Sequence, residues 1–277
     1  MAVSLRVALA VVCAVACDRG APAPQPAAEP AAARVVALSP SASEVVAALG
    51  AGSALVGVDD YSTYPPEVTG LPRVGSYQSP NLEVIVRLRP TLVIADDVHA
   101  DVARALADVH VATLAIPIHA LPDVETALRE VGDSLGRSDA AAHAIADIEA
   151  ARDAARAAQP AHRPRVLAVI DHEPGGLGNL IAVGPGTWLD ELLALAGGDN
   201  VLAASGVRYP KITAEEVVRG QPEVILDVGK AGDAAAWKAV DVPAVKNDRV
   251  RLLDAPYLMA PSPRLREAIA AVVQALR

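Results

Sequence analysis

Carboxylate and imidazole side chains follow two predicted strands of the chain. Asp96 and Asp97, with His99 nearby, come after one apolar stretch, and the run 171–173, which includes His172, comes after another. Such side chains can bind zinc or another divalent metal. The six histidines are scattered, however, without an HxH or HExxH spacing, so we expect no resident metal. Because loops at strand ends face the ligand crevice of open α/β sheets, His172 is a candidate contact for a ligand or for a metal within it.

Residues that could support catalysis lack a recognisable arrangement. Ser39 and Ser41 are not part of a Gly-x-Ser-x-Gly sequence, and helix capping explains them. The turn at 184–187 precedes a helix but lacks the lysine and the spacing of a P-loop, so Thr187 is expected to cap that helix and Trp188 to pack or to reach the cleft. We therefore expect no catalytic residue, no cofactor and no enzymatic activity.

One pattern of residue types occurs twice, at a constant spacing of 132 residues. Tyr77, Asn81, Glu83, Arg87 and Pro90 match Tyr209, Thr213, Glu215, Arg219 and Pro222. In each copy the Asn or Thr can cap a helix, the Glu lies in its first turn, and the Pro ends it. Two similar helices in any α/β protein would explain that much. The repeated tyrosine is not required by helix chemistry, and it fits two faces of one cleft that present rings to a shared ligand.

Alternating strands and helices position these groups in a first lobe at residues 34–122. Strands are expected at Arg34–Leu38, Leu55–Val58, Leu92–Ala95 and Val111–Ile116. A helix follows the first strand, with Ser41 and Glu44 spaced as a capping box and Gly50 at its end. This alternation is typical of a parallel sheet covered by helices.

A helical connection is expected at residues 123–160. Ser138 can cap an alanine-rich helix that runs to Ala158 and is ended by Pro160 and Pro164. About twenty residues of helix span about 30 Å, and polar positions leave only part of the surface apolar, so this helix could bridge two lobes as a strut. A second α/β lobe follows at 161–277, with strands at Arg165–Ile170, Val224–Val228 and Val250–Leu253 and helices at Thr187–Ala196 and Pro263–Leu276.

Composition and the N-terminal segment point to an exported protein. The net charge of −9 and the lack of basic clusters argue against nucleic acid. Residues 1–16 predict a signal peptide, and Ala14-Val15-Ala16-Cys17 resembles a lipobox, which would make Cys17 the lipidated residue. An ordinary secretory signal is the alternative. Residues 17–33 are rich in Pro and Ala and predict an extended tether.

The sequence resembles the helical-backbone periplasmic binding proteins that serve importers of vitamin B12, ferric siderophores and haem, and it is most similar to the vitamin B12-binding members. The motifs that carry this resemblance are RVVALSPS at 34–41, VGV at 56–58, YSTYPP at 61–66, PRVG at 72–75, NLE at 81–83, RPTLVIA at 89–95 and SPR at 262–264. The resemblance implies two Rossmann-like lobes joined by one long helix, with the ligand cleft between them. It also implies a monomer, lipid-anchored and facing the periplasm, that serves an ABC importer permease dimer with its ATPase subunits.

The same resemblance assigns roles to particular side chains. Glu83 and Glu215 match the residues that dock each lobe onto the permease, and two separate carboxylates would define an orientation on a twofold partner. The positions of cleft aromatics are matched by Tyr61, Tyr77, Tyr209 and Tyr257.

These tyrosines imply a cobalamin-type corrinoid as the transported ligand. The sequence departs from the corrinoid pattern at Asp96, where those binders tend to carry Trp. A ferric siderophore or haem is the alternative within the class, since Arg208 could pair with an anion. A zinc or other metal-binding chaperone, or an enzyme on a similar frame, is the alternative outside it.

Overall fold

The computed structural model describes residues 33–229 and 234–277. The expected signal peptide at 1–16, Cys17 and the tether up to residue 32 lie outside the described residues. Among the described residues, no helix combines the length and the apolar character needed to cross a membrane.

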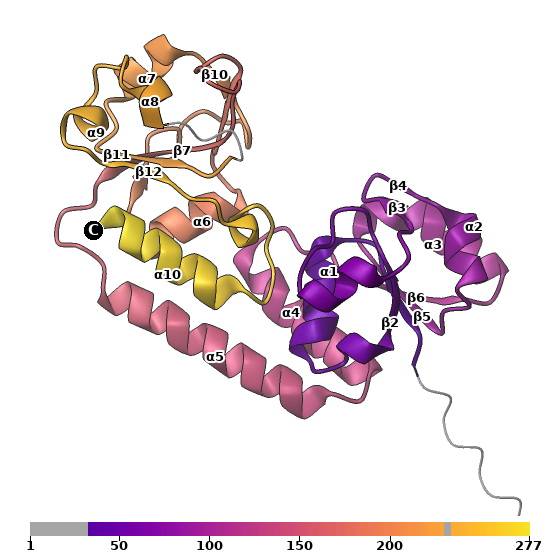
Figure 1. The fold of residues 1–277 in the computed structure, drawn as a ribbon. Coiled ribbons are helices and arrows are strands. Elements are labelled where there is room, and N and C mark those ends of the chain that lie inside the picture. The colour runs from indigo at the N-terminus through magenta and orange to yellow at the C-terminus, as the bar shows by residue number, and fades with distance from the viewer. Residues whose placement is uncertain (1–32, 230–233) are drawn as a thin grey trace, which may run out of the picture. The chain divides into compact units, whose positions relative to one another are not determined.

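The N-terminal lobe is a four-stranded parallel sheet with helices around it (Figure 1). Its elements are β1 (Val35–Ala37), α1 (Pro40–Ala48), β2 (Leu55–Val58), the hairpin β3 (Gly75–Ser76) and β4 (Ser79–Pro80), α2 (Leu82–Arg87), β5 (Leu92–Ala95), α3 (Ala100–Asp108) and β6 (Ala112–Ala115). The strand order is β2-β1-β5-β6, and every neighbour is parallel. The four predicted strands are confirmed. Because the chain leaves β1 for β2 on one side and returns to β5 on the other, the carboxyl ends of β1 and β5 flank a topological switch point.

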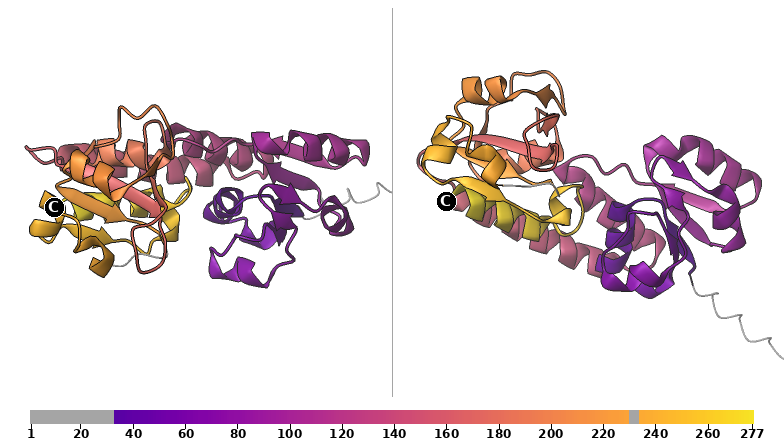
Figure 2. Two further views of the ribbon diagram at one scale, coloured as in Figure 1. Left: turned by 90° about the horizontal axis from the view of Figure 1, so that it is seen from above. Right: turned by 45° about the horizontal axis from the view of Figure 1, so that its top comes forward.

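Two helices lead out of this lobe. They are α4 (Leu121–Ser134) and α5 (Ser138–Ala157). Helix α5 packs against α10 (Leu265–Leu276) of the C-terminal lobe, and the two helices run side by side in Figure 1 and in the right view of Figure 2. The predicted strut helix is therefore confirmed.

The C-terminal lobe holds a mixed sheet. Its elements are β7 (Arg165–Asp171), β8 (Leu180–Ala182), α6 (Trp188–Leu195), β9 (Asp199–Asn200), β10 (Lys211–Ile212), α7 (Ala214–Gly220), β11 (Val224–Asp227), α8 (Ala234–Trp237), α9 (Pro243–Lys246), β12 (Val250–Leu252) and α10. The order is β10-β8-β7-β11-β12, with β9 also paired to β7. Strands β7, β11 and β12 are parallel, as expected, whereas β8 and β10 add an antiparallel edge.

The largest apolar core crosses from one lobe to the other. It starts under α1 in the N-terminal lobe, continues along α4 and α5, and reaches α6 and α10 beside the second sheet. Ile148, near the middle of α5, is buried within it. Smaller cores cover the other face of each sheet. The two lobes thus share a packed helical layer, and each sheet is covered on both faces.

Helix capping corrects two expectations. Ser39, not Ser41, caps α1, because its Oγ accepts a hydrogen bond from the Ala42 N–H at 3.1 Å. Ser138 does not cap α5; its hydroxyl donates to Asp133 instead. The predicted caps Asn81, Thr187 and Thr213 are confirmed, since each side chain accepts from a backbone N–H in the first turn of its helix.

Candidate functional site

A pocket of about 300 Å³ opens at the switch point of the N-terminal sheet. Its lining comes from the segments that follow β1 and β5, from three other loops of the same lobe, and from the chain just before α10. The lining residues are Ser39, Pro40, Ser41, Tyr61, Tyr77, Asp96, Ile118, Ala260 and Pro261. Crevices at the carboxyl ends of parallel strands are where open α/β sheets bind ligands. Asp96 is the one charged residue in this lining.

Two of the predicted tyrosines meet at this pocket. Tyr61 is 67% exposed, and its backbone N–H donates to the carboxylate of Asp59, which fixes the start of its loop. The Tyr77 hydroxyl donates to Asp96 Oδ2 at 3.0 Å. One ring therefore stands free at the mouth, while the other is held against the wall by its own hydroxyl.

Tyr77 and Asp96 form one wall of the pocket, and His99 hydrogen bonds to both of them, so it is not available as a metal ligand. Its Nδ1 accepts from the Asp96 N–H at 3.0 Å, so Nε2 carries the proton and donates to Tyr77 O at 2.5 Å. The buried ring also contacts Tyr77 edge to face, at 5.1 Å between centroids. With its lone pair used in this way, His99 positions both the tyrosine and the aspartate.

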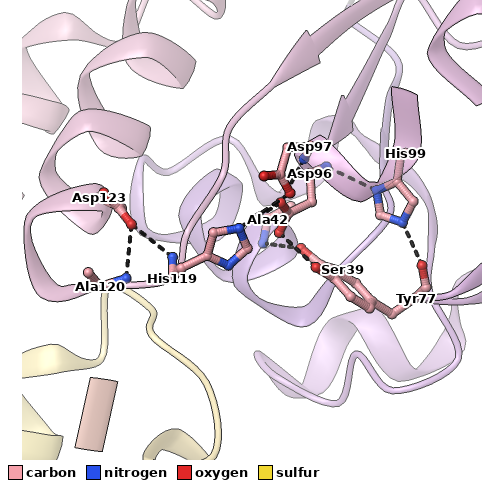
Figure 3. Close-up of polar contacts among 9 residues, drawn as sticks. All are labelled: Ser39, Ala42, Tyr77, Asp96, Asp97, His99, His119, Ala120 and Asp123. Carbon is pink, nitrogen blue, oxygen red and sulfur yellow. Dashed lines mark hydrogen bonds and ion pairs between the residues drawn. The ribbon is translucent and has the colours of Figure 1, made fainter. Parts of the chain in front are cut away.

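A second carboxylate and a second imidazole lie beside the wall (Figure 3). His119 Nε2 is 3.3 Å from Asp96 Oδ1 and 3.3 Å from Asp97 Oδ1. The carboxylate of Asp123, in the first turn of α4, accepts from the N–H groups of His119 and Ala120 and so fixes the loop that carries the imidazole.

The pKa values of the acidic groups around this pocket shift in different directions. Burial raises the pKa of Asp96, whereas hydrogen bonding to Asp96 lowers the pKa of the exposed Asp97. Burial and the neighbouring Asp96 carboxylate together raise the pKa of the Tyr77 phenol. The wall therefore favours a neutral phenol that donates to a buried carboxyl group.

The structure corrects the expectation that His172 contacts the ligand. Its side chain is fully buried in the C-terminal lobe, with Nε2 3.0 Å from Asp227 Oδ2 and Nδ1 2.8 Å from Gly176 O. Asp227 also accepts from Trp237 Nε1 at 3.0 Å. Both ring nitrogens are thus occupied by partners in the core. The sequence placed His172 at the correct strand end but could not show that its ring points inward.

Tyr257 is also used within the fold. The guanidinium of Arg264 lies over two rings, 4.1 Å from the centroid of Tyr64 and 4.5 Å from that of Tyr257. Tyr64 belongs to the N-terminal lobe and Tyr257 to the C-terminal lobe, so the stack joins them. Tyr257 is absent from the lining of this pocket and packs against Arg264, and a ligand contact by its ring stays a prediction.

The remaining predicted residues lie on the surface. Tyr209 is 51% exposed and does not line the pocket that holds Tyr61 and Tyr77. Glu83 and Glu215 are exposed in the first turns of α2 and α7. Glu83 pairs with Arg87 at 2.5 Å, whereas hydrogen bonds from its own backbone N–H and from Thr213 lower the pKa of Glu215. The two helices are therefore equivalent in place but not in side-chain pairing.

Sequence reasoning missed His119, together with the lining residues Ile118, Ala260 and Pro261. A signal was available for His119, because it follows β6 and Asp96 follows β5, and adjacent parallel strands bring their carboxyl ends together. No sequence pattern indicated that the segment before α10, with Ala260 and Pro261, lies against the N-terminal lobe.

The fold, with a pocket at the carboxyl ends of its strands, defines a class of protein, a two-lobed α/β solute binder. A profile of the periplasmic binding protein family matches residues 35–257, and the chain belongs to that family. Its members are non-enzymatic binders that work in the periplasm and deliver solutes to the permease of an ABC importer.

Individual relatives are similar over almost the whole chain. The vitamin B12-binding protein of Vibrio cholerae serotype O1 is 33% identical over 261 residues, which covers 89% of this chain and 90% of that protein. The periplasmic heme-binding protein RhuT from Roseiflexus sp. RS-1, in apo form, is 29% identical with a TM-score of 0.77. The match covers 89% of this chain and 100% of that chain. The periplasmic vitamin B12-binding protein BtuF of Vibrio cholerae is 29% identical with a TM-score of 0.73, and the match covers 88% of this chain and 96% of that chain.

Proposed function

We propose that this protein captures a cobalamin-type corrinoid and delivers it to the permease dimer of an ABC importer. The observation that carries the proposal is the charge of the pocket. The lining offers two tyrosine rings, two serines and a buried carboxylate, and none of its residues is a lysine or arginine. A corrinoid presents neutral amide side chains and a broad, flat ring, which suit hydrogen-bond acceptors and aromatic walls.

Haem is the second candidate, supported by the similarity to the heme-binding structure. Haem carries two carboxylates and many ferric siderophores are anionic, and such ligands gain most from arginine or lysine. Asp96 would instead face them with a like charge or require a proton. The Tyr77 hydroxyl already donates to Asp96, so it is not free to ligate iron without breaking that hydrogen bond. Both points favour the uncharged ligand.

Calorimetric titration of the purified protein tests the choice of ligand. Cyanocobalamin, haem and a ferric hydroxamate are titrated in parallel into the same preparation. One-to-one binding of cyanocobalamin alone is the expected result. Binding of haem or the siderophore without cyanocobalamin would contradict the proposed ligand but would leave the family role in place.

Docking through Glu83 and Glu215 is a further part of the proposal. Both carboxylates are exposed, at equivalent first turns of two helices in different lobes. The test is transport by the reconstituted importer with the Glu83→Ala, Glu215→Ala double variant. The matched control is Glu130→Ala, Glu149→Ala, which removes exposed carboxylates from α4 and α5. We expect transport to fall only in the first variant, with ligand binding unchanged in both; equal transport would remove the docking assignment.

We also propose that Cys17 is acylated and anchors the protein to a membrane facing the periplasm. The lipobox-like sequence before Cys17 supports this. Mass spectrometry of the mature N-terminus checks it, with Cys17→Ser as the control that should lose both acylation and membrane association. A mature N-terminus without lipid would indicate the ordinary secretory signal instead.

A further inference from the structure

Asp96, Asp97 and His119 bring three ligand atoms to one point (Figure 3). One ligand atom from each lies within 4.8 Å of the others. The two distances from His119 Nε2 to the carboxylate oxygens are both 3.3 Å. A tetrahedral zinc ion with bonds of about 2.0–2.2 Å places its ligand atoms about 3.3–3.6 Å apart. Two of the three separations therefore match the spacing of a zinc site, and the third, between the two carboxylates, is no more than 4.8 Å.

The charges around this point call for a cation. Within residues 33–229 and 234–277, no lysine or arginine pairs with Asp96 or Asp97, whose side chains contact each other, Tyr77 and His119. A neutral His119 carries at most one proton on Nε2, which cannot serve two carboxylate oxygens equally, and in the other tautomer no proton lies between them. A divalent cation bound by all three atoms satisfies the Nε2 lone pair and both carboxylates at once.

Supporting hydrogen bonds already hold the three groups in place. Tyr77 donates to Asp96 Oδ2, which leaves Oδ1 directed at His119, and the Asp97 N–H also donates to Oδ1. Asp123 fixes the backbone of His119. Metal ligands in proteins are commonly oriented by such outer hydrogen bonds. This feature separates the group from a chance pair of surface acids.

We propose that Asp96, Asp97 and His119 form a site for one divalent cation, with zinc the best fit, at the edge of the ligand pocket. The ligand set of one imidazole and two carboxylates suits zinc better than calcium, which takes six to eight oxygens. Asp96 is buried in the pocket wall, whereas Asp97 and His119 are partly exposed, so the ion can enter from solvent. A fourth position stays open for water or for an oxygen of a bound solute. The site does not depend on the identity of that solute.

Zinc chloride titrated calorimetrically into the chelator-treated full chain tests this site. Cys13→Ser and Cys17→Ser are included in every sample, so that no thiol binds the metal. One-to-one binding is expected, and His119→Gln or Asp97→Asn should weaken it more than Tyr77→Phe, which removes only a supporting hydrogen bond and should cost about tenfold. Cobalt(II) in place of zinc should give the intense visible bands of a tetrahedral ion, lost in the same variants.

His162→Gln and His143→Gln are the matched controls. His162 pairs with Glu223 in the other lobe, and His143 is an exposed histidine on α5. Both variants should bind zinc like the parent. No heat and no cobalt bands in the parent, or binding that is lost in His162→Gln and kept in His119→Gln, would overturn the proposal. Circular dichroism of each variant checks the fold, and cyanocobalamin titration of the same samples distinguishes a failed metal site from a failed solute proposal.

Discussion

His172 and Asp227 form an ion pair in which both side chains are fully buried, with Nε2 3.0 Å from Oδ2. The other nitrogen of the ring faces the carbonyl oxygens of Glu173 and Gly176. Because both nitrogens face acceptors, the ring is best satisfied as an imidazolium with two donors. The pair thus joins the end of β7 to the end of β11 and fastens the loop that follows β7.

This pair predicts a pH dependence of stability. Burial alone would lower the pKa of His172, but the acceptors Glu173 O, Asp227 and Gly176 O outweigh it and raise the pKa. A raised pKa in the folded state means that the contribution is complete below the unfolded value of about 6.5 and is lost as pH rises through the folded value. Urea unfolding at a series of pH values from 5 to about 9 measures it.

Asp227→Asn and His172→Gln supply the comparison for that series. Removing one member of a buried pair typically costs about 3–5 kcal/mol, because the other charge is left without a partner. We expect either variant to lower the free energy of unfolding and to flatten its decline above pH about 6.5. A parent protein whose stability stays level across that range would contradict the imidazolium assignment.

The stack of Arg264 between Tyr64 and Tyr257 predicts that Arg264→Ala destabilises the protein. Each cation–π contact contributes about 0.5–2 kcal/mol, and both rings lose their partner together. Arg264→Lys should recover only part of the loss, because an ammonium lacks the planar face of a guanidinium. Arg266→Ala is the control. The Arg266 side chain is exposed, and its ion pair with Asp147 is long, at 3.6 Å. Equal unfolding free energies for the Arg264 and Arg266 variants would count against a stabilising stack.

Gly184 lies against the segment that carries Tyr209. Its N–H donates to Arg208 O at 2.8 Å, and an added Cβ would collide with the backbone oxygen of Val207. We expect Gly184→Ala to displace residues 207–209 and to weaken solute binding if Tyr209 takes part. Gly70→Ala, where a Cβ meets open space, is the control in the same calorimetric titration. Parent-like binding in both variants would argue against a contribution from this segment.

Tyr77→Ala and Tyr209→Ala test the aromatic walls directly. By analogy with aromatic–base stacking, each lost ring should weaken corrinoid binding by about 1–3 kcal/mol. Tyr77→Phe keeps the ring and removes the hydroxyl, so comparison with Tyr77→Ala separates stacking from the hydrogen bond to Asp96. If Tyr209→Ala binds like the parent, the ligand contacts are confined to the pocket around Tyr61 and Tyr77.

The sequence predicted most of the sheet because local patterns determine it. The apolar runs at Leu55–Val58 and Leu92–Ala95 match β2 and β5 to the residue. Strands β8 and β10 were missed because they have three and two residues, too few for a clear hydrophobic pattern. The cap of α1 was misassigned because Ser41 and Glu44 have the spacing of a capping box, whereas the observed cap, Ser39, has Ala42 at that spacing.

The candidate site was predictable only in part. Tyr61 and Tyr77 could be named because they match positions of the periplasmic binding protein family, and Asp96 because it follows a predicted strand. The direction of a side chain at a strand end was not available, so His172 was expected in the cleft and lies in the core. His119 meets Asp96 only because β5 and β6 are neighbours, and that pairing is a property of the folded chain.

The apolar core that runs from α1 through α5 to α10 opposes separation of the two lobes. Pulling the lobes far apart would expose that core to water, at about 25 cal/mol for each Å² of apolar surface. Small adjustments at the pocket leave it intact. A solute therefore binds to a stiff receptacle, and we expect its entry and release to involve only small adjustments at the pocket.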